Sequence, residues 1–200
     1  MLKCHMHKDL IEAGCDEAGR GCLAGPVYAA AVILPKKYKN KWLDDSKKLS
    51  EKNRFELREI IIKDALDYAV VGVDHVTIDK INILNASILG MQKAVQQLKT
   101  KPQHLLIDGN RFKPFEGYKY TTVVKGDGIY MSIAAASILA KTERDLYMQT
   151  LHEQFPEYGW NTNMGYPTSF HREMLLRHGP TPFHRTTFKV KPKQLQLEIS

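Results

Sequence analysis

The 200-residue sequence contains only three cysteines and no long hydrophobic run. Cys4, Cys15 and Cys22 include no C-x-x-C pair, so neither a disulfide framework nor a structural zinc site is expected. The longest apolar stretch, residues 27–34, is far shorter than the roughly 20 residues that cross a bilayer. The first residues also lack the apolar segment of a signal peptide, and we therefore expect a cytoplasmic protein with no membrane partner.

Internal repeats, low-complexity tracts and linker-like segments are absent from the sequence as well. Its 43% hydrophobic and 26% charged residues are ordinary values for a globular chain, which excludes collagen-like and largely disordered proteins. A chain of this length fits a single domain. We expect one domain over residues 1–200, with a helical C-terminal part from about residue 142 and a mobile tail over residues 191–200.

Positive charge exceeds negative charge in this chain: 29 Lys and Arg residues against 22 Asp and Glu give a net charge of +7. Such an excess is typical of nucleic-acid binders, because cationic side chains displace the counterions condensed on phosphates. Residues 36–58 alone contain nine basic and four acidic side chains. A solvated helix face has the same composition, so charge indicates a nucleic-acid partner without establishing one.

The hydrophobic pattern predicts an α/β fold in which strands come early and helices late. Ser50 is predicted to cap a helix whose buried stripe comprises Phe55, Ile60 and Ile61. Short apolar segments predict strands over residues 10–16, 27–34, 69–73, 104–108 and 118–124. Helical spacing predicts further helices around Ile88, Met91, Val95 and Leu98, and over residues 132–155 and 169–178.

The segment from Gly19 to Ala24 matches the G-x-G-x-x-A fingerprint of dinucleotide-binding proteins. That fingerprint requires a following helix, because the N-terminus of the helix holds the pyrophosphate. Here Pro26 and an apolar segment with β-branched residues follow instead. The sequence therefore excludes a dinucleotide site at this position.

Carboxylates stand where predicted strands end. Asp16 and Glu17 close the first strand, Asp108 closes the fourth, and Asp127 follows the fifth within a glycine-flanked turn. Each alone is usually a turn residue or a helix cap, but Asp16 and Asp108 would converge if their strands were neighbours. Clustered carboxylates repel one another unless a cation neutralises them, and their hard oxygen atoms suit Mg²⁺ or Mn²⁺. Two such ions about 4 Å apart would clamp the attacking and leaving oxygens of a phosphodiester, so these acids indicate a metal-dependent nuclease.

A set of short motifs follows in a fixed order along the chain. They are C-D-E-A-G-R-G at residues 15–21 with L-A-G-P at 23–26, D-S-K-K-L at 45–49, D-G-N at 108–110, K-G-D at 125–127, A-A-S-I-L-A-K at 135–141 and G-Y at 165–166. In this order they resemble the motifs of type 2 ribonucleases H, in particular the bacterial ribonuclease HII family. The resemblance covers roughly residues 10–189.

This resemblance implies the ribonuclease H fold, a five-stranded mixed sheet flanked by helices, with a C-terminal helical extension. It implies four catalytic carboxylates, Asp16, Glu17, Asp108 and Asp127, of which the first three are metal ligands. Gly128 follows the fourth acid where many members carry serine, a difference that acts on the local turn. The implied cofactor is Mn²⁺ or Mg²⁺, with two ions in the catalytic complex.

The resemblance also assigns substrate binding to Gly19, Arg20, Gly21, Lys47, Lys48 and Tyr166. The backbone of the first three is expected to sense the ribose 2′-hydroxyl, and glycine permits that close approach. The tyrosine is expected to stack on the deoxyribose beyond the junction and to bond the 2′-hydroxyl, and the two lysines to contact phosphates. Ser137 and Lys141 are expected near the site, whereas the eight histidines are assigned structural or surface positions because the implied chemistry requires none.

The implied function is an endoribonuclease that cuts the RNA of RNA–DNA hybrids and cuts 5′ of single ribonucleotides in duplex DNA. Hydrolysis would leave 3′-hydroxyl and 5′-phosphate ends and would serve to remove misincorporated ribonucleotides and primers. We expect a monomer whose partners are RNA–DNA hybrids and ribonucleotide-containing duplex DNA.

Three alternatives remain open. Ribonuclease HIII is related but poor at single ribonucleotides, and typically carries an N-terminal substrate-binding domain; with the first strand predicted from residue 10, we expect no such domain here. A catalytically silent hybrid-binding module of the same fold is disfavoured by the presence of all four carboxylates. A different nuclease, such as a junction resolvase, is disfavoured by the G-R-G motif and Tyr166.

Overall fold

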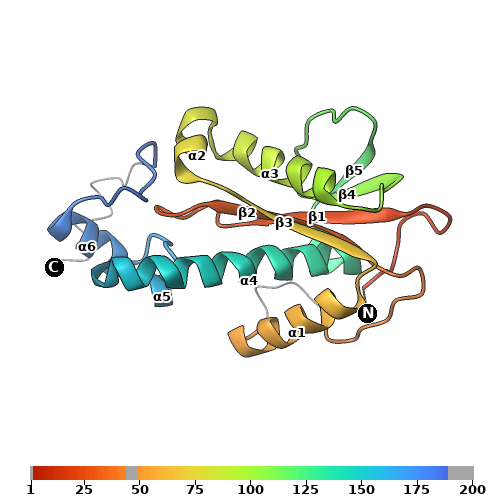
Figure 1. Ribbon diagram of the computed structural model, residues 1–200, viewed down its shortest axis with the longest axis horizontal. Helices are drawn as coiled ribbons and strands as arrows, with labels where there is room; N and C mark the ends of the chain where they lie inside the picture. Colours follow the sequence, from red (N-terminus) through yellow and green to blue (C-terminus); the bar gives the residue numbers. More distant parts are fainter. Residues whose placement is uncertain (1, 44–48, 189–200) are drawn as a thin grey trace.

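The computed structural model describes residues 2–43 and 49–188 (Figure 1). Lys47, Lys48 and the tail predicted over residues 191–200 lie outside the described residues. The described chain forms a five-stranded sheet in the order β3-β2-β1-β4-β5. Its strands are β1 (Glu12–Ala18), β2 (Val27–Ile33), β3 (Asp67–Val73), β4 (His104–Asp108) and β5 (Lys119–Val123).

The sheet is mixed, and its parallel part brings two of the predicted carboxylates together. β2 is antiparallel to both β1 and β3, whereas β4 is parallel to both β1 and β5. Cys15 of β1 lies opposite Ile107 of β4. Asp16 and Asp108 each follow by one residue, so the two acids reach the same edge of the sheet from neighbouring strands.

Helices cover both faces of this sheet, as predicted. They are α1 (Glu51–Asp64), α2 (His75–Ile81), α3 (Ile83–Gln97), α4 (Met131–Gln154), α5 (Trp160–Asn163) and α6 (Ser169–His178), with 3₁₀ turns η1 (Gly126–Gly128) and η2 (Pro156–Tyr158). α2 and α3 lie over one face, α4 and α1 over the other, and α5 and α6 lie beyond one end of the sheet (Figure 1). The predicted mixed sheet with a helical C-terminal extension is thus confirmed.

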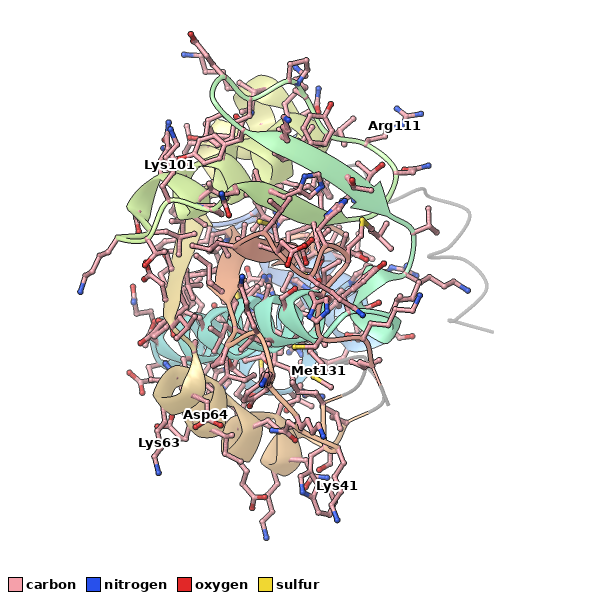
Figure 2. The ribbon with its side chains drawn as sticks, turned by 90° about the vertical axis from the view of Figure 1, so that its right-hand side faces the viewer. Lys41, Lys63, Asp64, Lys101, Arg111 and Met131 are labelled. Carbon is pink, nitrogen blue, oxygen red and sulfur yellow. The ribbon has the colours of Figure 1, made fainter. Side chains whose placement is uncertain are left out.

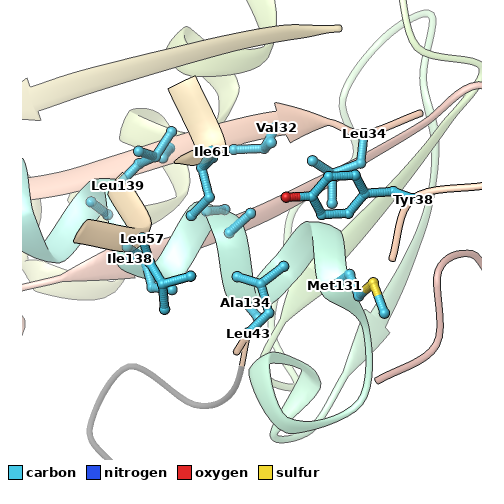
Figure 3. Close-up of a cluster of buried hydrophobic side chains, with 14 of the residues drawn as sticks. Val32, Leu34, Tyr38, Leu43, Leu57, Ile61, Met131, Ala134, Ile138 and Leu139 are labelled. Carbon is cyan, nitrogen blue, oxygen red and sulfur yellow. The ribbon is translucent and has the colours of Figure 1, made fainter. Parts of the chain in front are cut away.

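α4 packs directly on β1, and this contact places the site. A Cβ atom at Gly14 would overlap the backbone carbon of Ser132, so only glycine lets the helix approach so closely. Val32, Leu57, Ile61 and other apolar side chains complete this layer of the core between α1, α4 and the sheet (Figure 3). α4 therefore holds a fixed position against the strand that carries Asp16.

The cap predicted at Ser50 is confirmed: its hydroxyl accepts the N–H of Asn53 at 3.2 Å. The stripe predicted in the same helix is partly wrong. Leu57 and Ile61 are buried, whereas Ile60 is 39% exposed, because residues four apart share a helix face and adjacent residues do not.

Other elements differ from prediction as well. β1 continues to Ala18, so Asp16 and Glu17 lie within the strand rather than closing it. α2 was not predicted; it has seven residues and begins at a cap in which the Asp74 carboxylate accepts the N–H of Thr77 at 2.6 Å.

Charged side chains project at opposite ends of the molecule. Seen from the side, Lys41 and Lys63 extend near α1, and Lys101 and Arg111 extend at the opposite edge (Figure 2). Throughout the described residues, no helix is both long enough and apolar enough to cross a membrane.

Candidate active site

Asp16, within β1, is a buried acid, with 5% of its surface exposed. Its carboxylate accepts the N–H of Glu17 at 2.7 Å and a side-chain hydrogen bond from Ser137 of α4. Burial, and then the charges of Glu17 and Asp108, raise the pKa of Asp16 well above its usual range. Glu17 and Asp108 are therefore both close enough to Asp16 to repel its carboxylate.

Asp108, at the end of β4, is held by the turn that follows β5. Its Oδ1 accepts the N–H of Gly126 at 2.7 Å. A Cβ at Gly126 would lie 2.5 Å from Cδ1 of Ile133 and 3.3 Å from that same oxygen, so a side chain here would displace Ile133 and crowd the carboxylate. The hydrogen bond fixes the carboxylate of β4 relative to η1.

Asp127 lies in η1, directly after the glycine that binds Asp108. It is 4% exposed, and its Oδ1 accepts the N–H of Gly128 at 3.0 Å. The backbone of Gly128, the residue after this acid, is thus a donor to it. The structure brings three acids to one cavity and places the fourth in the adjoining turn.

The cavity at these acids has a volume of about 320 Å³ and gathers most of the predicted site. Its lining residues are Asp16, Glu17, Ala18, Gly19, Arg20, Gly21, Arg54, Asp108, Ser137, Lys141 and Tyr166. The predicted proximity of Ser137 and Lys141 is therefore confirmed. A second cavity of about 330 Å³ shares Glu17, Arg20 and Asp108 and extends toward α3 and Arg111.

The glycines of the loop after β1 have different roles. Gly19 has a φ of +94°, and a Cβ there would overlap Nε of Arg144, so the fold itself requires glycine. A Cβ at Gly21 would meet no atom within 4 Å, and its φ lies outside the left-handed region. The fold does not require glycine at position 21, and the open space there is available to a ligand.

Tyr166 closes another side of the cavity. Its ring centre lies 5.9 Å from the Arg144 guanidinium, and 38% of its surface is exposed. Burial, and then the neighbouring Cys22, raise the pKa of the phenol, so it stays protonated. The ring is thus presented at the cavity, and the phenol hydroxyl interacts with Cys22.

Arg54 was not predicted as a site residue. It reaches the cavity from the first turn of α1, and its guanidinium donates to the carbonyl of Leu49 at 2.6 Å. In the sequence it is one of nine basic residues in a charged stretch, and no local signal separates it from the others.

The donor set fits a hard divalent cation. Across residues 2–43 and 49–188, no group of three or more His, Cys, Asp or Glu side chains is arranged to hold an ion by itself. Mg²⁺ is commonly bound by only one or two carboxylates, with water and substrate phosphate oxygens completing its shell. A cation beside Asp16, Glu17 and Asp108 would also relieve the repulsion that raises the pKa of Asp16.

Comparison with known proteins identifies the family. The sequence profile described as Ribonuclease HII matches residues 13–191. The chain belongs to the ribonuclease HII family. It is 62% identical over 199 residues to the ribonuclease HII of Phocaeicola vulgatus, covering 100% of this chain and 99% of that protein. It is 63% identical over 190 residues to the ribonuclease HII of Bacteroides thetaiotaomicron, covering 95% of each.

Structural similarity agrees with this ribonuclease HII assignment. The crystal structure of the ribonuclease H2 of Pyrococcus horikoshii OT3 matches with a TM-score of 0.75 and 26% identity, over 93% of this chain and 97% of the other. As a member of the ribonuclease HII family, the chain is a metal-dependent endoribonuclease of the ribonuclease H type that acts on RNA–DNA hybrids. The fold and family expected from the ordered motifs are confirmed.

Proposed function

We propose that this chain also hydrolyses the phosphodiester on the 5′ side of single ribonucleotides in duplex DNA, leaving 3′-hydroxyl and 5′-phosphate ends. The supporting observation is that the carboxylates of β1 and β4 line one cavity together with Gly21 and Tyr166. A cavity that joins acids to an open main-chain segment and an aromatic ring suits a sugar–phosphate backbone with one distinctive sugar. The corresponding role is removal of misincorporated ribonucleotides and of primers.

Asp16, Glu17 and Asp108 are the proposed ligands of two divalent ions, Mg²⁺ or Mn²⁺, and Asp127 completes the acidic set from η1. The chemistry that such ions supply when bound is activation of water for in-line attack and neutralisation of charge on the departing 3′-oxygen. The chain contributes rigid placement, because neighbouring strands fix Asp16 and Asp108. The hydrogen bonds from Ser137 and from the amide of Gly126 orient the two carboxylates.

Substrate recognition is proposed to divide between sugar and phosphate. The main chain at Gly21 would approach the 2′-hydroxyl, since no side chain stands in the way, and Tyr166 would stack on the neighbouring sugar. Arg20 and Arg54, both at the cavity, would contact phosphates and position the strand without selecting the sugar. Lys47 and Lys48, outside the described residues, are proposed to contribute further phosphate contacts.

The test uses a labelled DNA duplex with one internal ribonucleotide, incubated with Mg²⁺, with Mn²⁺ or with EDTA. We expect a cut immediately 5′ of the ribonucleotide in the presence of either ion and none in EDTA. The matched control is the same duplex with a deoxyribonucleotide at that position, which should remain intact.

A uniform RNA–DNA hybrid completes the test. Cleavage of the hybrid alone would indicate a ribonuclease HIII-like specificity and would refute the proposed sugar-sensing roles of Gly21 and Tyr166. Binding of both substrates with cleavage of neither would indicate a silent hybrid-binding module.

A further inference from the structure

The segment after α6 contains two adjacent polar residues that are almost completely buried: His184 is 5% exposed and Arg185 is 2% exposed. This segment pairs with the loop between β1 and β2. The Arg185 N–H donates to the carbonyl of Leu23 at 2.8 Å, and the N–H of Gly25 donates to the carbonyl of Phe183 at 3.0 Å. The C-terminal segment therefore lies directly behind the loop that lines the cavity.

The Arg185 guanidinium binds backbone carbonyls of that loop. Its Nη2 donates to Gly19 O at 2.7 Å and its Nη1 to Arg20 O at 2.9 Å. Its Nε donates to Gly25 O at 2.9 Å and its Nη2 also to Pro26 O at 3.2 Å. The planar guanidinium thus binds both ends of the loop at once.

Fixing a carbonyl also fixes the N–H of the next residue, because a trans peptide is planar and its C=O and N–H point in opposite directions. Arg185 holds the carbonyls of Gly19 and Arg20, and consequently directs the N–H groups of Arg20 and Gly21 away from itself. These residues line the cavity that contains the acids.

A second chain of hydrogen bonds leads from the same segment to Tyr166. Nδ1 of His184 accepts the N–H of Thr181 at 2.9 Å, so its proton is on Nε2, which donates to Nε2 of His171 at 3.1 Å. The indole of Trp160, which can only donate, bonds that same atom at 3.0 Å. The proton of His171 must therefore be on Nδ1, which donates to the carbonyl of Tyr166 at 2.9 Å.

We propose that Arg185 and the His184–His171 pair are positioning residues for ribonucleotide recognition. Arg185 sets the main chain at Gly21, and the histidine pair sets the backbone of Tyr166, so one segment places both groups around the same sugar. This inference rests on the proposed function, in which these two groups contact the ribonucleotide.

The first test is Arg185→Lys, which keeps the charge but loses the fork. We expect kcat on the single-ribonucleotide duplex to fall by about 100-fold, the effect of a displacement of about 1 Å in a positioned group. KM should change less than about threefold, because phosphate contacts made elsewhere dominate binding. Ile61→Ala is the control: it removes a fully buried side chain from the last turn of α1, and should lower the thermal midpoint while leaving both constants nearly unchanged.

The second test compares His171→Asn with His171→Leu. The asparagine amide can still donate to the carbonyl of Tyr166, whereas leucine cannot, so kcat should fall roughly tenfold or more in the leucine variant and be largely retained in the asparagine variant.

The outcomes separate the two proposals. A wild-type chain that leaves the single-ribonucleotide duplex uncut refutes the proposed function and the inference with it. A wild type that cuts it while Arg185→Lys keeps its kcat, or while both His171 variants lose kcat equally, refutes the inference alone.

Discussion

Lowering the pH from 7 to 4 should weaken the fold through the buried His171–His184 pair. Each ring already uses one nitrogen as a hydrogen-bond acceptor. A proton added to that nitrogen would point at the N–H group that donates to it, and the hydrogen bond would be lost. Burial, and then the neighbouring His171 and His75, lower the pKa of His184 to about 4. Burial also lowers the pKa of His171.

The sign and size of the effect follow from these shifts. The unfolded chain protonates His184 below the ordinary histidine pKa of about 6.5, whereas the folded chain keeps the ring neutral until about pH 4. The unfolded state therefore binds more protons in this window, and the free energy of unfolding falls as the pH falls. At about 1.4 kcal/mol for each pKa unit, His184 accounts for a loss of at most about 3 kcal/mol, complete near pH 4.

Urea unfolding monitored by tryptophan fluorescence at a series of pH values between 7 and 4 measures this loss. The comparison is His184→Asn, which removes the titrating ring but can still accept from Thr181. We expect the wild type to lose about 2–3 kcal/mol more than the variant across the window. Asp16, whose raised pKa acts in the opposite direction, titrates in both proteins and cancels. Parallel curves, within about 0.5 kcal/mol, would refute the assignment of this slope to His184.

Three further variants test the site and its support. Asp108→Asn keeps the acceptor for the amide of Gly126, so the thermal midpoint should hold while turnover falls by at least about 100-fold and substrate binding persists; near-normal rates would remove this acid from the mechanism. Gly21→Ala should leave the thermal midpoint unchanged and lower kcat on the single-ribonucleotide duplex by roughly tenfold, and full activity would contradict close main-chain approach. Gly14→Ala should cost about 3 kcal/mol in urea unfolding, because its Cβ would overlap the backbone at Ser132, and a neutral effect would contradict the packing of α4 on β1.

Elements with strong local signals were predictable from the sequence. β4 and α6 have the predicted bounds, because a continuous apolar run between turns and a helix closed by Gly179 are recognisable within ten residues. α2 was missed because seven residues give too short a periodic pattern. Ile60 was misplaced because a run of three isoleucines leaves the buried face of α1 undefined.

The pairing of the strands was harder to predict from the sequence. Asp16 and Asp108 were each placed near the end of a strand, but the parallel pairing that makes their strands neighbours joins segments about 90 residues apart. No hairpin turn encodes such a contact. Before the structure, their convergence followed from the family resemblance and not from any local pattern.

The residues that hold the loop after β1 were the hardest to predict from the sequence. A guanidinium removed from water is costly unless its N–H groups find acceptors, so the sequence alone favours a surface position for Arg185. The acceptors are carbonyls about 160 residues earlier, in a loop whose Gly19 and Gly25 have φ values of +94° and +79°. The missing Cβ at Gly19 also leaves room for Arg144. The glycines and the arginine are therefore two parts of one structural feature. Gly21 is not required by this feature, so the constraint on that position is the proposed approach of its main chain to the ribonucleotide.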